Sequence, residues 1–158
     1  MDFGKAKFPI LIRAAWFGIN RAFREKLRHK TRLTPVQYTL LRNLYEGKRL
    51  GDELNQQALS ELLSTNKNNL ADLLNRMEGR GLVKRHESKA DQRNKRVSIT
   101  ASGEKEFLLA RKHALVLQSE ILSGFRQEEK RLLFSYFSRC NDRLEGIARQ
   151  SERSALGD

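Results

Sequence analysis

The sequence is poor in cysteine, proline and histidine: its 158 residues include one cysteine, two prolines and three histidines. The lone Cys140 cannot form a disulfide within the chain, and no group of cysteines and histidines has the spacing of zinc ligands. Long apolar runs are also missing, because Arg13 interrupts the stretch Phe8–Ile12 after five residues, which is too short for a signal peptide or a membrane span. We therefore expect a cytoplasmic protein, not bound to membranes, that folds as a single domain over residues 1–158 without disulfides or metals.

Motifs of the common enzyme classes are missing too. The sequence contains no phosphate-binding loop, nucleophile elbow, HExxH motif or paired-carboxylate motif. The histidines, His29, His86 and His113, have no neighbours at catalytic or metal-binding spacing. We therefore expect no enzymatic activity and no cofactor.

Acidic residues are outnumbered by basic ones, with 19 Asp and Glu against 31 Lys and Arg and a net charge of +12. The excess is largest in residues 1–32, which hold nine basic and two acidic residues, and nearly absent from residues 101–158, which hold ten and nine. Such a protein attracts polyanions, and nucleic acid is the partner that this charge indicates. The alternative is a basic amphipathic helix over residues 8–28 that lies on a membrane surface.

Hydrophobic periodicity predicts helices in the first third of the chain. The stripe of the first helix recurs every three or four residues and consists of Ile12, Trp16, Ile19, Phe23 and Leu27. A second helix starts at Thr34-Pro35-Val36-Gln37, where threonine can cap, proline suits the first turn and Gln37 can complete a capping box. We expect this helix to end near Gly47.

Two short helices with a tight turn at Ser64-Thr65 are predicted next, the second of them capped by Asn66. Leu70, Leu73, Leu74 and Met77 share one face of that second helix, and the opposite face is polar. Asparagine can pair with adenine, and arginine or lysine can reach guanine edges or phosphates. The predicted DNA-reading residues on this helix are Asn66, Lys67, Asn68, Asn69, Asp72 and Arg76.

The pattern then changes to two strands, Leu82–His86 and Arg96–Ile99, separated by the polar stretch Ser88–Lys95. We interpret this hairpin as a wing whose basic tip could enter a minor groove, where arginine is attracted by the negative potential. The predicted wing residues are Arg85, Lys89, Asp91, Arg93, Lys95 and Arg96, with Asp91 placed to orient Arg93. The fold class is therefore mainly α with a small β-hairpin wing, an α+β fold.

Two more helices complete the chain. Thr100 can cap the first, which is interrupted at Ser123-Gly124, and the tail beyond Gln150 is expected to fray. Leu133, Phe137, Cys140, Leu144 and Ile147 repeat at three and four residues along the last helix, the spacing of a seam with a partner helix. Because Cys140 lies on this seam, we expect a buried structural thiol rather than an oxidation sensor.

The order of these elements, and the residues themselves, resemble the MarR family of winged helix-turn-helix regulators over residues 33–104. The residues that carry the resemblance are Leu33-Thr34 with Gln37, Leu59-Ser60-Glu61-Leu62-Leu63, Met77-Glu78 with Gly81-Leu82-Val83, and Asp91-Gln92-Arg93 leading to Val97-Ser98-Ile99-Thr100 and Gly103. Gln92 departs from the Asp-Arg-Arg that is familiar in the family, and Asp72 stands where a basic residue is common.

The resemblance implies a homodimer in which helices of residues 6–30 and 105–150 interleave and two lobes, each of residues 33–104, bind double-stranded DNA. The recognition helices would enter successive major grooves of a palindromic operator, about 10 base pairs apart. The resemblance also implies a repressor that responds to a small aromatic or anionic effector. Arg13, Trp16, Phe17 and Arg42 have suitable side chains for such an effector, although Trp16 lies on the apolar stripe and is expected in the core. The alternative function is a winged-helix module that binds RNA or a protein, since a fold does not dictate its function.

Overall fold

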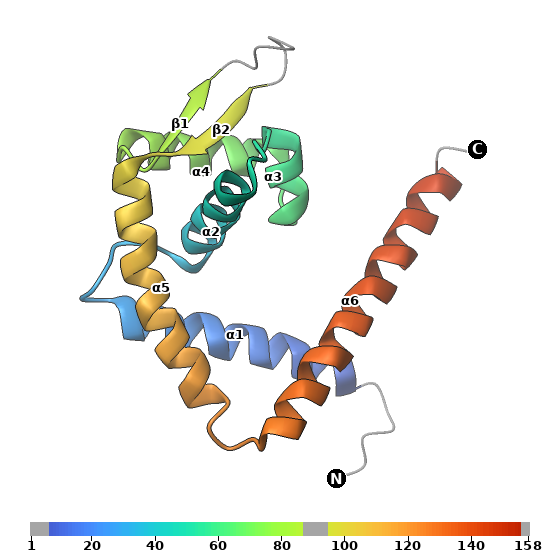
Figure 1. The fold of residues 1–158 in the computed structure, drawn as a ribbon. Helices are drawn as coiled ribbons and strands as arrows, with labels where there is room; N and C mark the ends of the chain where they lie inside the picture. The colour runs from blue at the N-terminus through green and yellow to red at the C-terminus, as the bar shows by residue number, and fades with distance from the viewer. Residues whose placement is uncertain (1–6, 87–94, 156–158) are drawn as a thin grey trace. The chain divides into compact units, whose positions relative to one another are not determined.

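The computed structural model describes residues 7–86 and 95–155, with side chains as far as Gln150 (Figure 1). Its elements, in chain order, are α1 Lys7–Leu27, α2 Pro35–Leu50, α3 Gln56–Leu62, α4 Lys67–Gly79, β1 Val83–His86, β2 Arg96–Ile99, α5 Ala101–Ile121 and α6 Gln127–Ala155. The mainly helical fold with one antiparallel hairpin confirms the expected fold class. The chain divides into two compact units, Met1–Leu117 and Gln118–Asp158.

Within the described ranges, no helix combines the length and the apolar character that crossing a bilayer requires. The same residues contain no group of three or more histidine, cysteine, aspartate or glutamate side chains that could hold a metal ion.

Helix α2 begins as the sequence predicts and ends later. The hydroxyl of Thr34 accepts a hydrogen bond from the Gln37 amide at 3.3 Å, and Gln37 Oε1 accepts one from the Thr34 amide at 3.0 Å, which completes the capping box. The predicted end near Gly47 is wrong, because the helix continues to Leu50 and Gly51 closes it with a left-handed φ of 73°. Gly47 instead lets the following loop approach closely, since a Cβ atom there would lie 2.9 Å from the carbonyl oxygen of Asp52.

The core of the first unit joins α1, α2 and α5 through aromatic contacts. Phe107 of α5 is fully buried, and its ring centroid lies 5.5 Å from that of Tyr38 and 5.0 Å from that of Tyr45, both on α2. Phe23 of α1 packs against Tyr38 with the centroids 5.1 Å apart. These three helices therefore share one core, to which α1 contributes its C-terminal half.

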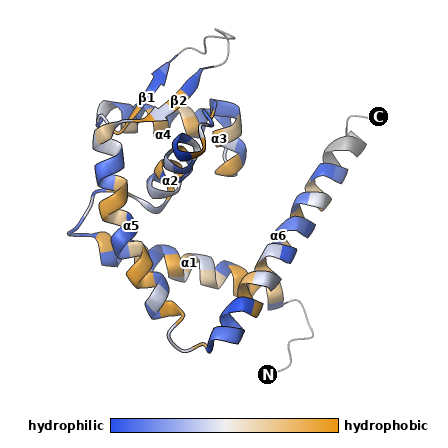
Figure 2. Ribbon diagram, in the orientation of Figure 1, coloured by the Kyte–Doolittle hydropathy of each residue, from blue (hydrophilic) through white to orange (hydrophobic). Residues whose placement is uncertain are grey.

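The N-terminal half of α1 leaves its apolar side chains in water. Phe23 and Leu27 are buried, but Trp16 is 63% exposed, so the expectation that Trp16 belongs to the core is wrong for the single chain. The hydrophobic colour of this part of α1 is visible in Figure 2. Hydrophobic periodicity correctly predicted the helix, but it does not indicate whether the apolar stripe packs against the same chain or against another chain.

Helix α5 begins against the hairpin. Thr100 caps it by accepting from the Gly103 amide at 3.0 Å, and the Thr100 hydroxyl donates to the Gly81 carbonyl at 2.6 Å. The contact leaves no space for a side chain at position 103, because a Cβ atom on Gly103 would lie 2.0 Å from the carbonyl oxygen of Leu82. The end of α4, the start of β1 and the first turn of α5 are thereby held together.

The second unit consists of the end of α5 and the helix α6. Helix α6 extends to Ala155, so the expectation of fraying directly after Gln150 is wrong. Phe137 and Leu144 of the predicted seam are exposed, and the thiol of Cys140 is only half-buried rather than buried. Among the described residues of this unit, no side chain covers Phe137 or Leu144 enough to bury it.

Candidate nucleic-acid interface

Helix α4 has one buried face and one exposed polar face, as its sequence predicts. The side chain of Asn66 caps the helix by accepting from the Asn69 amide at 2.8 Å, and Ser64 supplies the tight turn before it with a left-handed φ of 47°. The buried face consists of Leu70, Leu73, Leu74 and Met77. The predicted reading residues after the cap are all exposed: Lys67, Asn68, Asn69, Asp72 and Arg76.

Arg76 is the arginine on this face that is available to a partner. Among the described residues its side chain has no hydrogen bond or ion pair, and the same holds for the side chains of Lys67 and Asn68. Asn66 differs, because its side-chain oxygen is already used by the cap. The exposed face therefore offers free amide, ammonium and guanidinium groups on a rigid helix.

The hairpin beside α4 pairs antiparallel, with Val83 opposite Ile99 and His86 opposite Arg96. The segment Leu54–Gln56 also hydrogen-bonds to this hairpin, which the sequence analysis did not predict. The Val97 amide donates to the Leu54 carbonyl at 3.0 Å, and the Gln56 amide donates to the Lys95 carbonyl at 3.3 Å. This segment is too short to show the alternation by which strands are recognised in a sequence. It ties the start of β2 to the start of α3.

The predicted wing residues fall into three groups. Lys89, Asp91 and Arg93 lie outside the described residues. Lys95 is exposed and lies directly before β2. The remaining two, Arg85 and Arg96, are bound by other residues of the chain. Arg96 Nη1 donates to the Glu53 carbonyl at 2.6 Å, and Arg96 Nε lies 3.6 Å from the Glu53 carboxylate.

Arg85 links the hairpin to the predicted reading helix. Its Nε and Nη2 donate to Glu78 Oε2 at 2.9 and 2.5 Å, its amide donates to Glu78 Oε1 at 2.9 Å, and its Nη2 also donates to Asn75 Oδ1 at 2.7 Å. The Arg85 amide, followed by the guanidinium, holds the pKa of Glu78 below its usual value. The sequence singled out Arg85 as a DNA contact and gave no sign of this pairing, which fixes the hairpin relative to α4.

The Glu78–Arg85 pair should stabilise the fold at neutral pH and lose that effect in acid. Because the pKa of Glu78 is lowered by folding, its contribution is present above the unfolded-state value and disappears as the pH falls through the folded-state value. Both side chains are partly exposed, so we expect Glu78→Gln to reduce the free energy of unfolding at pH 7 by about 1 kcal/mol. Urea unfolding of the two proteins should give a smaller difference at pH 3.

Glu46→Gln is the matched control, because Glu46 forms an exposed helical pair with Arg49 at 3.2 Å. That variant should change stability by less than about 0.5 kcal/mol. An equal loss for both variants, or a loss for Glu78→Gln that does not depend on pH, would contradict a special role for the Glu78–Arg85 pair.

The residues suggested for an effector are only partly brought together. The guanidinium carbon of Arg13 lies 5.5 Å from the centroid of the Phe17 ring, and Trp16 is exposed beside them on α1. Arg42 lies on α2, where it opposes the rise that burial causes in the pKa of Tyr38. None of the hydrogen bonds, ion pairs or ring contacts of the described residues joins Arg42 to the group on α1.

Comparison with known proteins agrees with this architecture. The family model described as "MarR family" matches residues 33–95, which begin just before α2 and end at the residue before β2. The transcriptional regulator HosA of Escherichia coli O127:H6 is 36% identical over 100 residues, which cover 63% of this chain and 71% of HosA. The chain belongs to the MarR family. YdgJ of Bacillus subtilis, described as an HTH-type transcriptional regulator, is 25% identical over 130 residues, or 82% of this chain and 77% of YdgJ.

Solved structures match the fold of this MarR-family chain. The DNA complex of Staphylococcus aureus MepR matches with a TM-score of 0.77 at 21% identity, covering 87% of this chain and 97% of MepR. The repressor CouR, bound to a 23-mer DNA duplex, matches with a TM-score of 0.76 at 20% identity, covering 89% and 98% of the two chains. The named relatives are regulators, so the expectation of a MarR-type transcriptional regulator rather than an enzyme is confirmed at the level of the family.

Proposed function

We propose that the chain acts in the cytoplasm as a homodimeric, sequence-specific repressor that binds double-stranded DNA. The observation that carries this proposal is the exposed polar face of α4, whose opposite face is fully packed against the protein. A rigid helix with free amide and guanidinium groups on one side has the form that enters a major groove. Two relatives of this fold, MepR and CouR, have been solved with DNA.

In this proposal the residues of α4 divide into reading and positioning groups. Asn68 and Arg76 are exposed, and their side chains have no partner among the described residues, so they can pair with adenine and guanine edges, while Lys67 in the first turn contacts a phosphate. Asp72 accepts from a cytosine amine, a role open to an exposed carboxylate on this face. Asn66, Asn69, Arg85, Lys95 and Arg96 are proposed to make further DNA contacts, and Lys89, Asp91 and Arg93 are proposed to contact the minor groove.

The dimer is proposed to form through residues 6–30 and 105–150, leaving residues 33–104 as the DNA-binding lobe. Trp16 and Phe17 on α1 and Phe134, Tyr136 and Leu144 on α6 are all exposed large apolar side chains in the single chain. A soluble monomer seldom exposes so many, and contiguous exposed apolar surface marks an interface. Two copies would then place two α4 helices on successive turns of a duplex, about 10 base pairs apart.

Replacing Leu144 by glutamate should dissociate the dimer. Leu144 is 59% exposed in the single chain, and burying an unpaired carboxylate between two helices costs several kcal/mol, or about 100-fold or more in the dimer dissociation constant. Analytical ultracentrifugation of Leu144→Glu should show monomers at concentrations where the parent protein is dimeric.

Ser135→Glu is the control, with the same charge change on an exposed residue about 180° around α6 from Leu144. It should remain dimeric. A monomeric parent protein, or a Leu144→Glu variant that stays dimeric, would contradict the proposed interface.

The function is tested by selecting genomic fragments that the purified protein binds and measuring their affinity as the salt concentration changes. We expect a palindromic site and a steep loss of affinity with salt, because phosphate contacts release counterions. Aromatic carboxylic acids should be added in a parallel selection, since we propose that Arg13, Trp16, Phe17 and Arg42 take part in binding such an effector. Equal binding to all duplexes, or a preference for RNA, would contradict the proposed function.

A further inference from the structure

A second basic feature lies away from the exposed face of α4, at the loop between α1 and α2. The structure has a pocket of about 590 Å³ there. Its walls come from the loop that follows α1, from the residues after α4 and from the first turns of α5: Arg28, His29, Lys30, Thr31, Arg32, Arg80, Leu82, Ser102 and Glu106. A volume of about 300–1,000 Å³ is usual for small-molecule sites.

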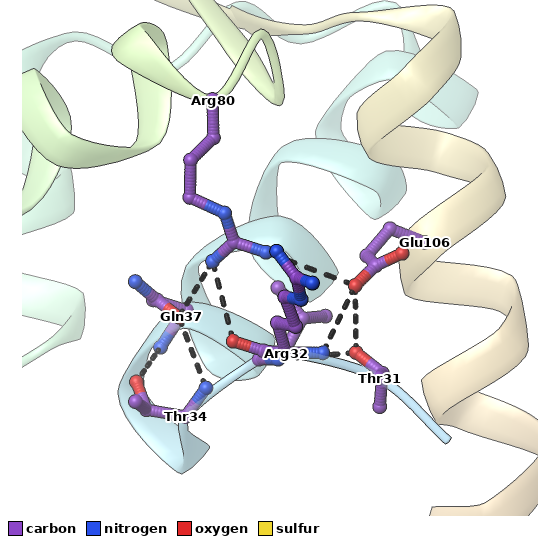
Figure 3. A network of polar contacts seen from close by, with 7 residues as sticks. Thr31, Arg32, Thr34, Gln37, Arg80 and Glu106 are labelled. Atoms are coloured by element: carbon purple, nitrogen blue, oxygen red, sulfur yellow. Dashed lines mark hydrogen bonds and ion pairs between the residues drawn. The ribbon is translucent and has the colours of Figure 1, made fainter. Parts of the chain in front are cut away.

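One wall of the pocket is an ordered network around Arg80 (Figure 3). Arg80 Nη1 donates to the Arg32 carbonyl at 3.2 Å and to Gln37 Oε1 at 3.4 Å, and Arg80 Nη2 lies 3.8 Å from Glu106 Oε1. Glu106 Oε1 also accepts from the Thr31 hydroxyl at 2.8 Å and from the Arg32 amide at 3.2 Å. The side chains of Arg80 and Glu106 are 33% and 27% exposed, so both are oriented by the fold and still reach solvent.

The Arg80 network leaves positive charge unsatisfied. Four basic side chains line the pocket, those of Arg28, Lys30, Arg32 and Arg80, against the single lining carboxylate of Glu106. Of the four, Arg28 also lies 3.9 Å from the carboxylate of Glu25, which is outside the lining. The Glu106 carboxylate already accepts two other hydrogen bonds, and its separation of 3.8 Å from Arg80 Nη2 exceeds the 2.7–2.9 Å of a charge-assisted hydrogen bond. The guanidinium of Arg80 therefore keeps donors for another acceptor.

We propose that this pocket is a binding site for a small hydrophilic polyanion, such as a phosphorylated or polycarboxylate metabolite. Leu82 is the one apolar side chain in its walls, so the lining suits a polar ligand better than an aromatic acid. Two or more negative charges on one ligand can engage Arg80 at the inner wall and Lys30 and Arg32 at the rim, with the hydroxyls of Thr31 and Ser102 as further donors. This site is separate from the effector site proposed around Arg13.

The test is isothermal titration calorimetry of the full chain with pyrophosphate and, separately, with citrate, at an ionic strength held constant with sodium chloride. The pocket variant is Lys30→Gln with Arg32→Gln, both exposed residues. The matched control is Arg21→Gln with Arg24→Gln, which removes the same charge from exposed positions on α1 outside the pocket. We expect one saturable site per chain, at least tenfold weaker in the pocket variant and within twofold of the parent in the control.

The two ligands distinguish the sources of the anion. Binding of pyrophosphate alone indicates a phosphorylated ligand, and binding of citrate alone indicates a polycarboxylate; either result supports the site. No saturable binding of either ligand, or equal weakening in both variants, would overturn it, because equal weakening is the result expected of diffuse surface charge. No DNA is present in this titration, so its outcome is independent of the proposed function.

Discussion

A Gly103→Ala variant is expected to lose about 3 kcal/mol or more of folding free energy, because the added methyl group overlaps the protein backbone. The new Cβ would lie 2.0 Å from the carbonyl oxygen of Leu82 and 3.0 Å from Cγ1 of Ile99. Neither atom is the end of a flexible side chain, so α5 and the hairpin would have to move apart. Urea unfolding followed by circular dichroism measures the loss.

The same substitution at Gly79 is the control. Gly79 is the last residue of α4, and a Cβ atom there would meet nothing within 4 Å. Alanine should be neutral or stabilise the helix by up to about 1 kcal/mol, since glycine is the weaker helix former. Equal stabilities for the two variants would mean that α5 and the hairpin do not approach as closely as described. The Gly103→Ala variant therefore measures the steric cost of separating two closely packed backbone segments, and not the loss of a side-chain contact.

The second large effect concerns the exposed face of α4. Replacing both Asn68 and Arg76 by alanine should weaken operator binding by about 100-fold or more, because a bidentate side chain–base pair contributes about 1–3 kcal/mol of discrimination. Both side chains are exposed, so the fold should be unaffected. Gel-shift titrations of the selected operator and of an unrelated duplex would measure the effect.

Lys67→Ala separates reading from positioning. If Lys67 contacts a phosphate, its loss weakens binding to the operator and to unrelated DNA by similar factors and reduces the salt dependence. Loss of Asn68 and Arg76 should instead reduce the preference for the operator. Similar losses on all sequences for both variants would show that Asn68 and Arg76 do not read bases.

The parts of the fold that the sequence could predict are those that depend on residues close together in the chain. The caps at Thr34, Asn66 and Thr100 each depend on a few adjacent residues, and all three form as expected. The faces of α4 follow from helical periodicity, so the buried face and the exposed polar face were both predictable. Gly47 misled the prediction, because a glycine near a helix end can serve close packing as well as termination.

The features that sequence reasoning missed depend on residues brought together by folding. The pairing of Leu54 with Val97 joins positions far apart in the chain. The use of Arg85 as a link to Glu78 depends on how the hairpin returns against α4, and the charge pattern alone indicated only a basic wing. Trp16 shows a further limit, because an apolar stripe does not reveal whether its partner is in the same chain.

The apolar surface of α1 and α6 has a consequence for gene dosage. If two chains must associate before either can occupy an operator, the dimer concentration at low expression rises with the square of the chain concentration. Halving the number of chains would then remove about three quarters of the dimers while association is the limiting step. Exposed side chains such as Trp16 and Leu144 would thereby make a promoter respond more sharply to the supply of its regulator than one-to-one binding allows.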